Sequence, residues 1–171
     1  YHRPYVAIWI EDASGKVAAN LSVWYDVDLK DSEGEKWLKD IRQWWRRTGR
    51  TLDMPMDGVS SPTKAPGVNK VTFPSDKGAL AKLAPGEYKL VVEATREVGG
   101  KEMVEVPFKW APGSEATASA KGKEELGAIT TTNGLALTKV GRELAQLPVD
   151  PRMARMLAEA HKAGCLKEML I

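Results

Sequence analysis

The sequence predicts a mainly β protein: an antiparallel β-sandwich with one inserted Trp-rich helix, followed by a short α-helical tail. Three observations favour this fold class. Alternating apolar residues recur between Gly and Pro turns over most of the chain, which is typical of sandwiches. A single stretch carries tryptophans at helical spacing. Beyond residues 125–129 the pattern changes to short capped helices, so we expect a domain boundary between residues 1–129 and 130–171.

The first two strands are predicted to pair as a hairpin. Residues 5–10 are apolar at both parities, as expected of a strand that is covered on both faces. Residues 11–16 form a turn cluster that contains Gly15. Residues 17–25 alternate between the two faces and return antiparallel to the first strand.

A helix is predicted over residues 32–47. Ser32 and Glu35 have the spacing of a capping box, and Gly49 is a typical residue for the end of a helix. The apolar face of this helix consists of Trp37, Ile41 and Trp44, with Leu38 and Trp45 beside it.

The end of this helix has two interpretations. The tryptophans could stack on a ligand while the arginines bind an anion, or the tryptophans could anchor the helix on the sheet. We favour the second, because aromatic stripes at helical spacing are usually core. Adjacent tryptophans lie about 100° apart on a helix, which would bring one of them to the surface. The candidate partner surface is therefore Trp44, Trp45, Arg46, Arg47 and Arg50, next to the polar connection over residues 51–66.

The remaining strands are predicted over residues 68–73, 87–96 and 102–110. Gly99-Gly100 is a hairpin signal between the last two. Pro107 cannot donate a ladder hydrogen bond, so the last of these strands is expected at a sheet edge or with a bulge.

Five segments of the first 129 residues resemble a bacterial family of predicted periplasmic proteins of unknown function. They are residues 1–12 (YHRPYVAIWIED), 36–47 (KWLKDIRQWWRR), 84–88 (APGEY), 106–110 (VPFKW) and 118–127 (ASAKGKEELG). The PGEY turn and its strand are also similar to the immunoglobulin-like part of FlgD, a flagellar hook-cap scaffold. The resemblance implies a periplasmic, immunoglobulin-like β-sandwich and no catalytic residue. Members of the family usually have a signal peptide and a further strand before the YHRPY segment, so an unpaired sheet edge is expected here.

The tail resembles a different protein family. Residues 135–157 (LALTKVGRELAQLPVDPRMARML) and 163–168 (AGCLKE) are similar to the helicase-associated winged-helix and ratchet region of DEAH-box RNA helicases of the HrpA type. The phosphate-binding Gly-x-Gly-Lys-Thr loop and the Asp-Glu-Ala-His segment of those helicases do not occur in this sequence, so ATP hydrolysis is not expected. Residues 124–129 fit both families, which favours a chimera over a selected fusion. The candidate RNA contacts in this tail are Arg142, Arg152 and Arg155.

Charge and composition narrow the function further. Residues 130–171 hold six Lys/Arg and four Asp/Glu, so 19 basic and 19 acidic residues cancel in the first 129. A neutral domain is a poor electrostatic match for nucleic acid.

Cys165, the single cysteine, excludes an internal disulfide. His2, Glu11 and Asp12 are a weak catalytic grouping, and Glu11-Asp12 leading into a Gly turn is ordinary turn chemistry. Glu124 and Glu125 are interpreted as a solvated charge run.

We therefore expect a non-enzymatic periplasmic β-sandwich that binds an unknown protein or small ligand, with no cofactor, no metal, no membrane span and a non-functional helicase-derived tail. The alternative is an RNA-binding accessory fragment of a DEAH-box helicase without its motor.

Overall fold

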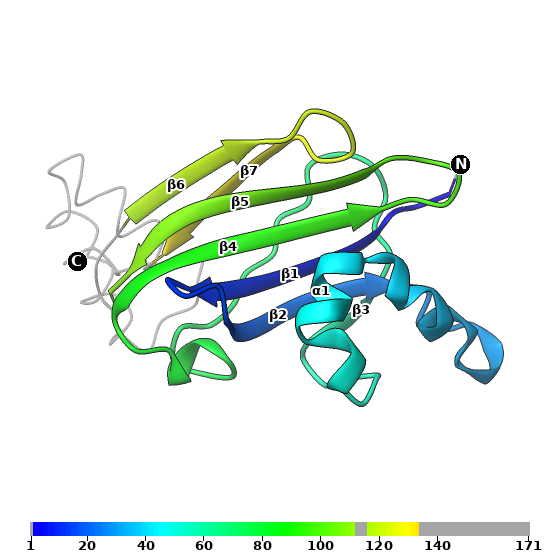
Figure 1. Ribbon diagram of the computed structural model, residues 1–171, viewed down its shortest axis with the longest axis horizontal. Helices are drawn as coiled ribbons and strands as arrows, with labels where there is room; N and C mark the ends of the chain where they lie inside the picture. The colour runs from blue at the N-terminus through cyan, green and yellow to red at the C-terminus, as the bar shows by residue number, and fades with distance from the viewer. Residues whose placement is uncertain (1, 112–115, 134–171) are drawn as a thin grey trace, which may run out of the picture. The chain divides into compact units, whose positions relative to one another are not determined.

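The computed structural model describes residues 2–111 and 116–133, and this part of the chain is mainly β, as predicted (Figure 1). The predicted tail helices lie outside the described residues. In chain order the elements are β1 (Tyr5–Asp12), β2 (Val17–Tyr25), η1 (Lys30–Asp40), α1 (Arg42–Arg47), η2 (Gly49–Thr51), β3 (Ser60–Pro62), η3 (Leu80–Lys82), β4 (Gly86–Thr95), β5 (Lys101–Trp110), β6 (Ala116–Lys121) and β7 (Ala128–Asn133). No helix of the described residues is both long and apolar enough to cross a membrane.

Five strands form one sheet in the order β3-β2-β1-β4-β5, and β6 pairs with β7 in a second, two-stranded sheet. β1 is central and pairs antiparallel with β2 and β4, which explains its apolar residues at both parities. β4 pairs antiparallel with β5. β3 runs parallel to the end of β2, so the sheet is mixed and the purely antiparallel prediction is wrong at this strand. The helices between β2 and β3 provide the crossover that a parallel pair needs.

The five-stranded sheet buries a different core on each face. The helix-side core consists of Ala7, Trp9, Val23, Tyr25, Leu38, Ile41, Trp44 and Val91. Leu38 belongs to η1, Ile41 is the residue between the two helices, and Trp44 belongs to α1, which lies across β1 and β2 in Figure 1. The hairpin-side core consists of Val6, Ile8, Ile10, Ala19, Leu21, Trp24, Val92, Ala94, Phe108 and Trp110, and Ala118 and Ile129 of β6 and β7 pack against it.

The Trp-rich helix differs from its prediction. The chain forms the 3-10 run η1 and then, after Ile41, the short helix α1, in place of one α-helix from Ser32. Ser32 has a φ of 55° and makes no capping hydrogen bond, so the capping box does not form. Gly34 is buried, and a Cβ there would collide with the Asp26 carbonyl, so the turn packs tightly against the end of β2. Gly49 follows Thr48, the C-cap residue of α1, and so takes the position expected for it after the helix, and its lack of a side chain also lets the Trp44 ring approach its backbone.

Two predictions in the loops and edges have opposite outcomes. The strand predicted over residues 68–73 does not form. Val68 is fully exposed, and of these residues only Phe73 packs against the core. β5 is the edge of the five-stranded sheet, which confirms the edge position expected from Pro107.

The predicted boundary at residue 129 falls inside β7, which continues to Asn133. Leu126 and Ile129 pack against the hairpin-side core, and residues 1–134 form one compact unit. The segment shared by the two resembled families is therefore built into the β unit.

Candidate functional site

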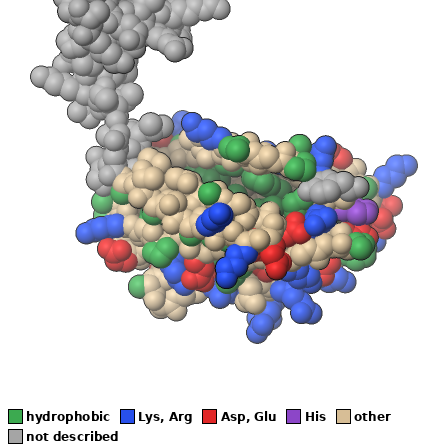
Figure 2. Space-filling view, turned by 90° about the horizontal axis from the view of Figure 1, so that it is seen from above, with side chains coloured by type: hydrophobic (Ala, Val, Ile, Leu, Met, Phe, Trp, Pro, Cys, Tyr) green, Lys and Arg blue, Asp and Glu red, His purple; other side chains and the backbone are tan. Residues whose placement is uncertain are grey.

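An open groove of about 820 Å³ lies at one end of the β unit. Five segments line it: the N-terminal residues before and at the start of β1, the turn after β2, the helix η1, Thr63 after β3, and the tip of the β4–β5 hairpin. Its lining residues include His2, Arg3, Tyr5, Asp26, Leu29, Trp37, Asp40, Thr63, Thr95, Arg96, Glu97 and Lys101. On the face drawn in Figure 2, acidic and basic side chains are interspersed and do not form a patch of one sign.

Trp37 is the main exposed aromatic side chain of the groove, with 54% of its surface accessible, and Leu29 beside it is 46% exposed. The 3-10 geometry of η1 explains this orientation. With three residues per turn, Leu38 and Ile41 face the core at i and i+3, and Trp44 continues that line. Trp37 precedes this line by one residue and turns outward. The sequence analysis assumed an α-helical period, which places Trp37 on the buried face, so its exposure was not predicted.

Tyr5 links the floor of the groove to the turn after β2. Its hydroxyl donates to Asp26 Oδ2 at 3.3 Å, and Thr63 donates to Asp26 Oδ1 at 3.4 Å. Burial raises the pKa of Tyr5 to about 12, and the negative charges of Asp26 and Glu97 add to the effect. Tyr5 is therefore a neutral hydrogen-bonding group at physiological pH.

The hairpin wall of the groove is fixed by an ion pair. Arg96 Nη2 lies 2.7 Å from Glu125 Oε1, and the same carboxylate accepts from the Gly100 N–H at 2.9 Å. The Arg96 guanidinium holds the pKa of Glu125 below its ordinary value. Glu125 is thus a paired structural residue, and its interpretation as part of a solvated charge run is wrong.

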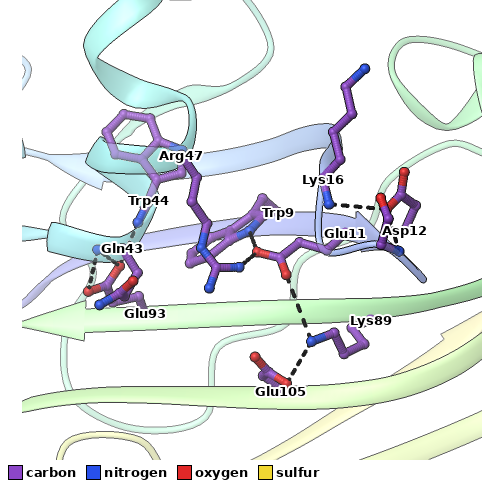
Figure 3. A network of polar contacts seen from close by, with 11 residues as sticks. Trp9, Glu11, Asp12, Lys16, Gln43, Trp44, Arg47, Lys89, Glu93 and Glu105 are labelled. Atoms are coloured by element: carbon purple, nitrogen blue, oxygen red, sulfur yellow. Dashed lines mark hydrogen bonds and ion pairs between the residues drawn. The ribbon is translucent and has the colours of Figure 1, made fainter.

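A second polar cluster surrounds Glu11, whose side chain is fully buried (Figure 3). Its Oε1 accepts from Trp9 Nε1 at 2.7 Å and pairs with the Arg47 guanidinium. Lys89 Nζ lies 3.9 Å from Oε2 and 2.9 Å from Glu105 Oε2. Two cations therefore flank the buried carboxylate, and the pair with Arg47 ties α1 to β1.

The beginning of α1 is held by another carboxylate of the sheet, Glu93 of β4 (Figure 3). It accepts from the Trp44 N–H at 2.9 Å and from the Gln43 N–H at 3.0 and 3.1 Å. Glu93 thus caps the helix from a distant strand, in place of a local side-chain cap. No local sequence signal could reveal it.

The structure spreads the predicted partner surface over different environments. Trp44 is completely buried and donates its indole N–H to Asn20 Oδ1 at 2.9 Å, so it offers no contact area. Trp45 is half-buried against the helix-side core. Arg46 and Arg50 are exposed, while Arg47 pairs with Glu11.

The weak catalytic grouping is not brought together. His2 pairs with Glu97 at 3.2 Å beside the groove, whereas Glu11 and Asp12 lie at the other end of β1. Asp12 accepts from the Ser14 and Lys16 backbone N–H groups, which confirms its role as a turn residue. For Glu11 the same interpretation is wrong, because its side chain is buried in β1 and paired with Arg47. Within residues 2–111 and 116–133, no group of three acidic, His or Cys side chains could hold a metal ion. The candidate RNA contacts Arg142, Arg152 and Arg155 lie outside the described residues.

Comparisons with known proteins agree with the two resemblances of the sequence. A family model described as "Predicted periplasmic protein (DUF2271)" matches residues 1–128. The ATP-dependent RNA helicase HrpA of Escherichia coli is 59% identical over 51 residues, and the HrpA homolog of Haemophilus influenzae is 53% identical over 53. Each of these matches covers 28% of this chain but only 4% of the helicase. No solved structure matches.

Proposed function

This chain belongs to the DUF2271 family of predicted periplasmic proteins, and from that premise we propose that it is a non-enzymatic binding module of the periplasm whose contact site is the Trp37 groove. The observation that carries the proposal is the exposed indole of Trp37 beside Leu29 in a concave site. A volume of about 820 Å³ is within the range of small-molecule sites. Trp side chains are also enriched where proteins bind partners.

The non-enzymatic part of the proposal is supported by what the buried carboxylates do. Glu11 is held between Arg47 and Lys89, and Glu93 caps α1. Both therefore have structural partners inside the β unit. In the groove Tyr5 is neutral, and His2, Glu97 and Arg96 are engaged in ion pairs, an arrangement that suits binding more than proton transfer.

Two finer features of the fold and surface belong to the same proposal. The packing of β6 and β7 on the hairpin-side core supports a relationship to immunoglobulin-like, FlgD-like sandwiches. Trp45, Arg46 and Arg50 would be a secondary contact surface for a protein partner, adjoining the segment that contains β3. We also propose that the helicase-like tail is a chimeric addition without a motor.

The test uses the indole ¹⁵N–¹H spectrum of the 171-residue chain. We expect the small-molecule fraction of a Gram-negative periplasm to shift the Trp37 indole signal, which Trp37→Ala assigns by removing it. In the wild type, the same fraction should also move the backbone amide signals of Leu29 and Thr95, because both residues line the groove. In Trp37→Ala these ligand-induced changes should be absent. If no signal shifts, or if only a tryptophan outside the groove responds, the proposal is wrong.

The similarity to HrpA supports one rival function, in which the tail binds RNA through Arg142, Arg152 and Arg155. A gel-shift assay at low salt tests it, since phosphate contacts are strongest there. Binding that falls steeply with salt, and that is lost when the three arginines are changed to Gln, would favour the rival. No shift would eliminate it.

A further inference from the structure

The groove presents a flat apolar surface together with polar groups that still have bonding capacity. Trp37 and Leu29 supply the apolar part. Lys39 Nζ lies 5.9 Å from the centre of the Trp37 ring, but a cation–π contact at an exposed site is weak. A ligand could therefore displace the lysine at little cost and stack on the indole.

Hydrogen-bond donors and acceptors lie around this surface in similar numbers. The Asp40 carboxylate is half-buried and has no hydrogen-bond donor among the described residues. Among the described residues, the Asp26 carboxylate accepts the long bonds from Tyr5 and Thr63. Arg3 and Lys101 are exposed donors that have no carboxylate within ion-pair distance in the described part of the chain. The ligand must offer both donors and acceptors to use these groups.

The charges of the groove favour a neutral ligand. Its cations are Arg3, Arg96 and Lys101, and its anions are Asp26, Asp40 and Glu97, with His2 facing Glu97. Equal numbers leave no field that would attract a polyanion or a polycation. A phosphorylated or nucleic-acid ligand would also bring its charge close to three carboxylates.

The backbone at the groove argues against an extended peptide that would add a strand. At the hairpin tip, the Arg96 N–H donates to Gly100 O at 3.2 Å and the Gly99 N–H donates to Arg96 O at 3.0 Å. The Gly100 N–H is bound by Glu125. These groups are already satisfied, whereas strand addition needs free backbone donors and acceptors.

We propose that the Trp37 groove binds a neutral saccharide. This inference rests on the proposed binding function and names its ligand class. A pyranose ring has an apolar C–H face that can stack on the Trp37 indole, and hydroxyls at its edge that both donate and accept. Asp40 accepts from a hydroxyl on the η1 side, and Arg3 or Lys101 donates to hydroxyls on the opposite walls.

Three neutral trisaccharides test the inference on the 171-residue chain: maltotriose, cellotriose and N-acetylated chitotriose. Isothermal titration measures affinity, and the Trp37 indole signal reports the place of binding. We expect at least one sugar to bind with a Kd in or below the millimolar range and to shift that signal. Which sugar binds distinguishes a glucan from an amino-sugar polymer.

Two variants and their matched controls complete the test. Trp37→Ala should weaken binding at least tenfold, because the stacking surface is lost, and Asp40→Asn should weaken it several-fold. Val68→Ala and Asp76→Asn, which are exposed positions outside the groove, should leave the affinity unchanged. Thermal unfolding of all four variants shows whether any loss of binding comes from loss of folding.

The outcomes separate this inference from the function on which it rests. If no trisaccharide shifts Trp37 but the periplasmic small-molecule fraction does, the binding module stands and the saccharide is wrong. If neither shifts Trp37, both are wrong. A sugar that binds with equal affinity to Trp37→Ala would also overturn the saccharide site.

Discussion

At the scale of the residue, the two tryptophans at positions 37 and 44 have opposite roles. Trp44 is completely buried in the helix-side core and bonded to Asn20, whereas Trp37 is more than half exposed in the groove. The sequence pattern placed both on one apolar helix face and included only Trp44 in the candidate partner surface. In the structure, Trp44 stabilises the core and Trp37 lies at the surface.

Alanine substitution of these two tryptophans should therefore have very different effects on stability. Trp44→Ala should lower the free energy of unfolding by about 3–5 kcal/mol, because it leaves a cavity in the core. Trp37→Ala should change it by no more than about 0.5 kcal/mol, as is usual for surface positions. Urea denaturation followed by circular dichroism measures both. Equal losses would contradict the assignment.

Tyr5 should make the stability of the protein sensitive to alkaline pH. In the unfolded chain this phenol ionises near its ordinary value of 10.0, but in the folded protein it keeps its proton up to about 12. Raising the pH from 10 to 12 therefore favours the unfolded state, and the contribution of Tyr5 is lost across this window. Urea midpoints of the wild type and Tyr5→Phe, measured against pH, should show a smaller alkaline decline for the variant. Parallel declines would rule out the raised pKa.

At the scale of the element, the sequence predicted a helix or strand correctly where neighbouring residues determine it, and failed where contacts between distant residues do. Strands β1, β2, β4 and β5 follow from alternation and turn residues, and Pro107 correctly indicated an edge. The capping box at Ser32 failed because contacts of Gly34 with the end of β2 and the kink before it determine how η1 begins. Residues 68–73 had a strand-like composition but pair with no strand among the described residues. The groove was missed because it is assembled from five segments that are separated in the sequence.

The helix α1 has only six residues, so we expect its N-terminal cap to matter. Glu93→Ala leaves the backbone N–H groups of Gln43 and Trp44 without their acceptor, and should destabilise the protein by about 2 kcal/mol. Glu87→Ala, at an exposed position of the same strand, is the matched control and should be nearly neutral. The urea unfolding midpoints of the two variants, each compared with the wild type, measure this difference in stability. A neutral Glu93→Ala would show that the cap contributes little.

At the scale of the whole molecule, the β unit includes the segment that the two resembled families share. Glu102 of β5 accepts from the Glu124 N–H at 3.1 Å and the Leu126 N–H at 2.6 Å, and Glu125 pairs with Arg96. The turn between β6 and β7 is thus held to the β4–β5 hairpin. The change of character in the sequence near residues 125–129 does not end the fold, because β7 begins there and continues to Asn133.

The Arg96–Glu125 pair should therefore contribute to the stability of the unit in a pH-dependent way. Because the folded-state pKa of Glu125 lies below its ordinary value of 4.5, the contribution is present above pH 4.5 and is lost as the pH falls through the folded-state pKa. Glu125→Gln should be less stable than the wild type at neutral pH, and the difference should shrink in acid. Unfolding curves at both pH values measure it. A difference that is independent of pH would contradict the ion pair.

The most direct test of the account is hydrogen exchange of the six tryptophan indole N–H groups in the free protein. Four of them are hydrogen-bonded: Trp9 to Glu11, Trp24 to Ser22, Trp44 to Asn20 and Trp110 to the Leu83 carbonyl. We predict that these four exchange slowly, whereas Trp37 exchanges fast and slows when a groove ligand is bound. Slow exchange at Trp37 in the free protein, or fast exchange at Trp44, would contradict the central claim that the β unit buries Trp9, Trp24, Trp44 and Trp110 and leaves Trp37 for binding.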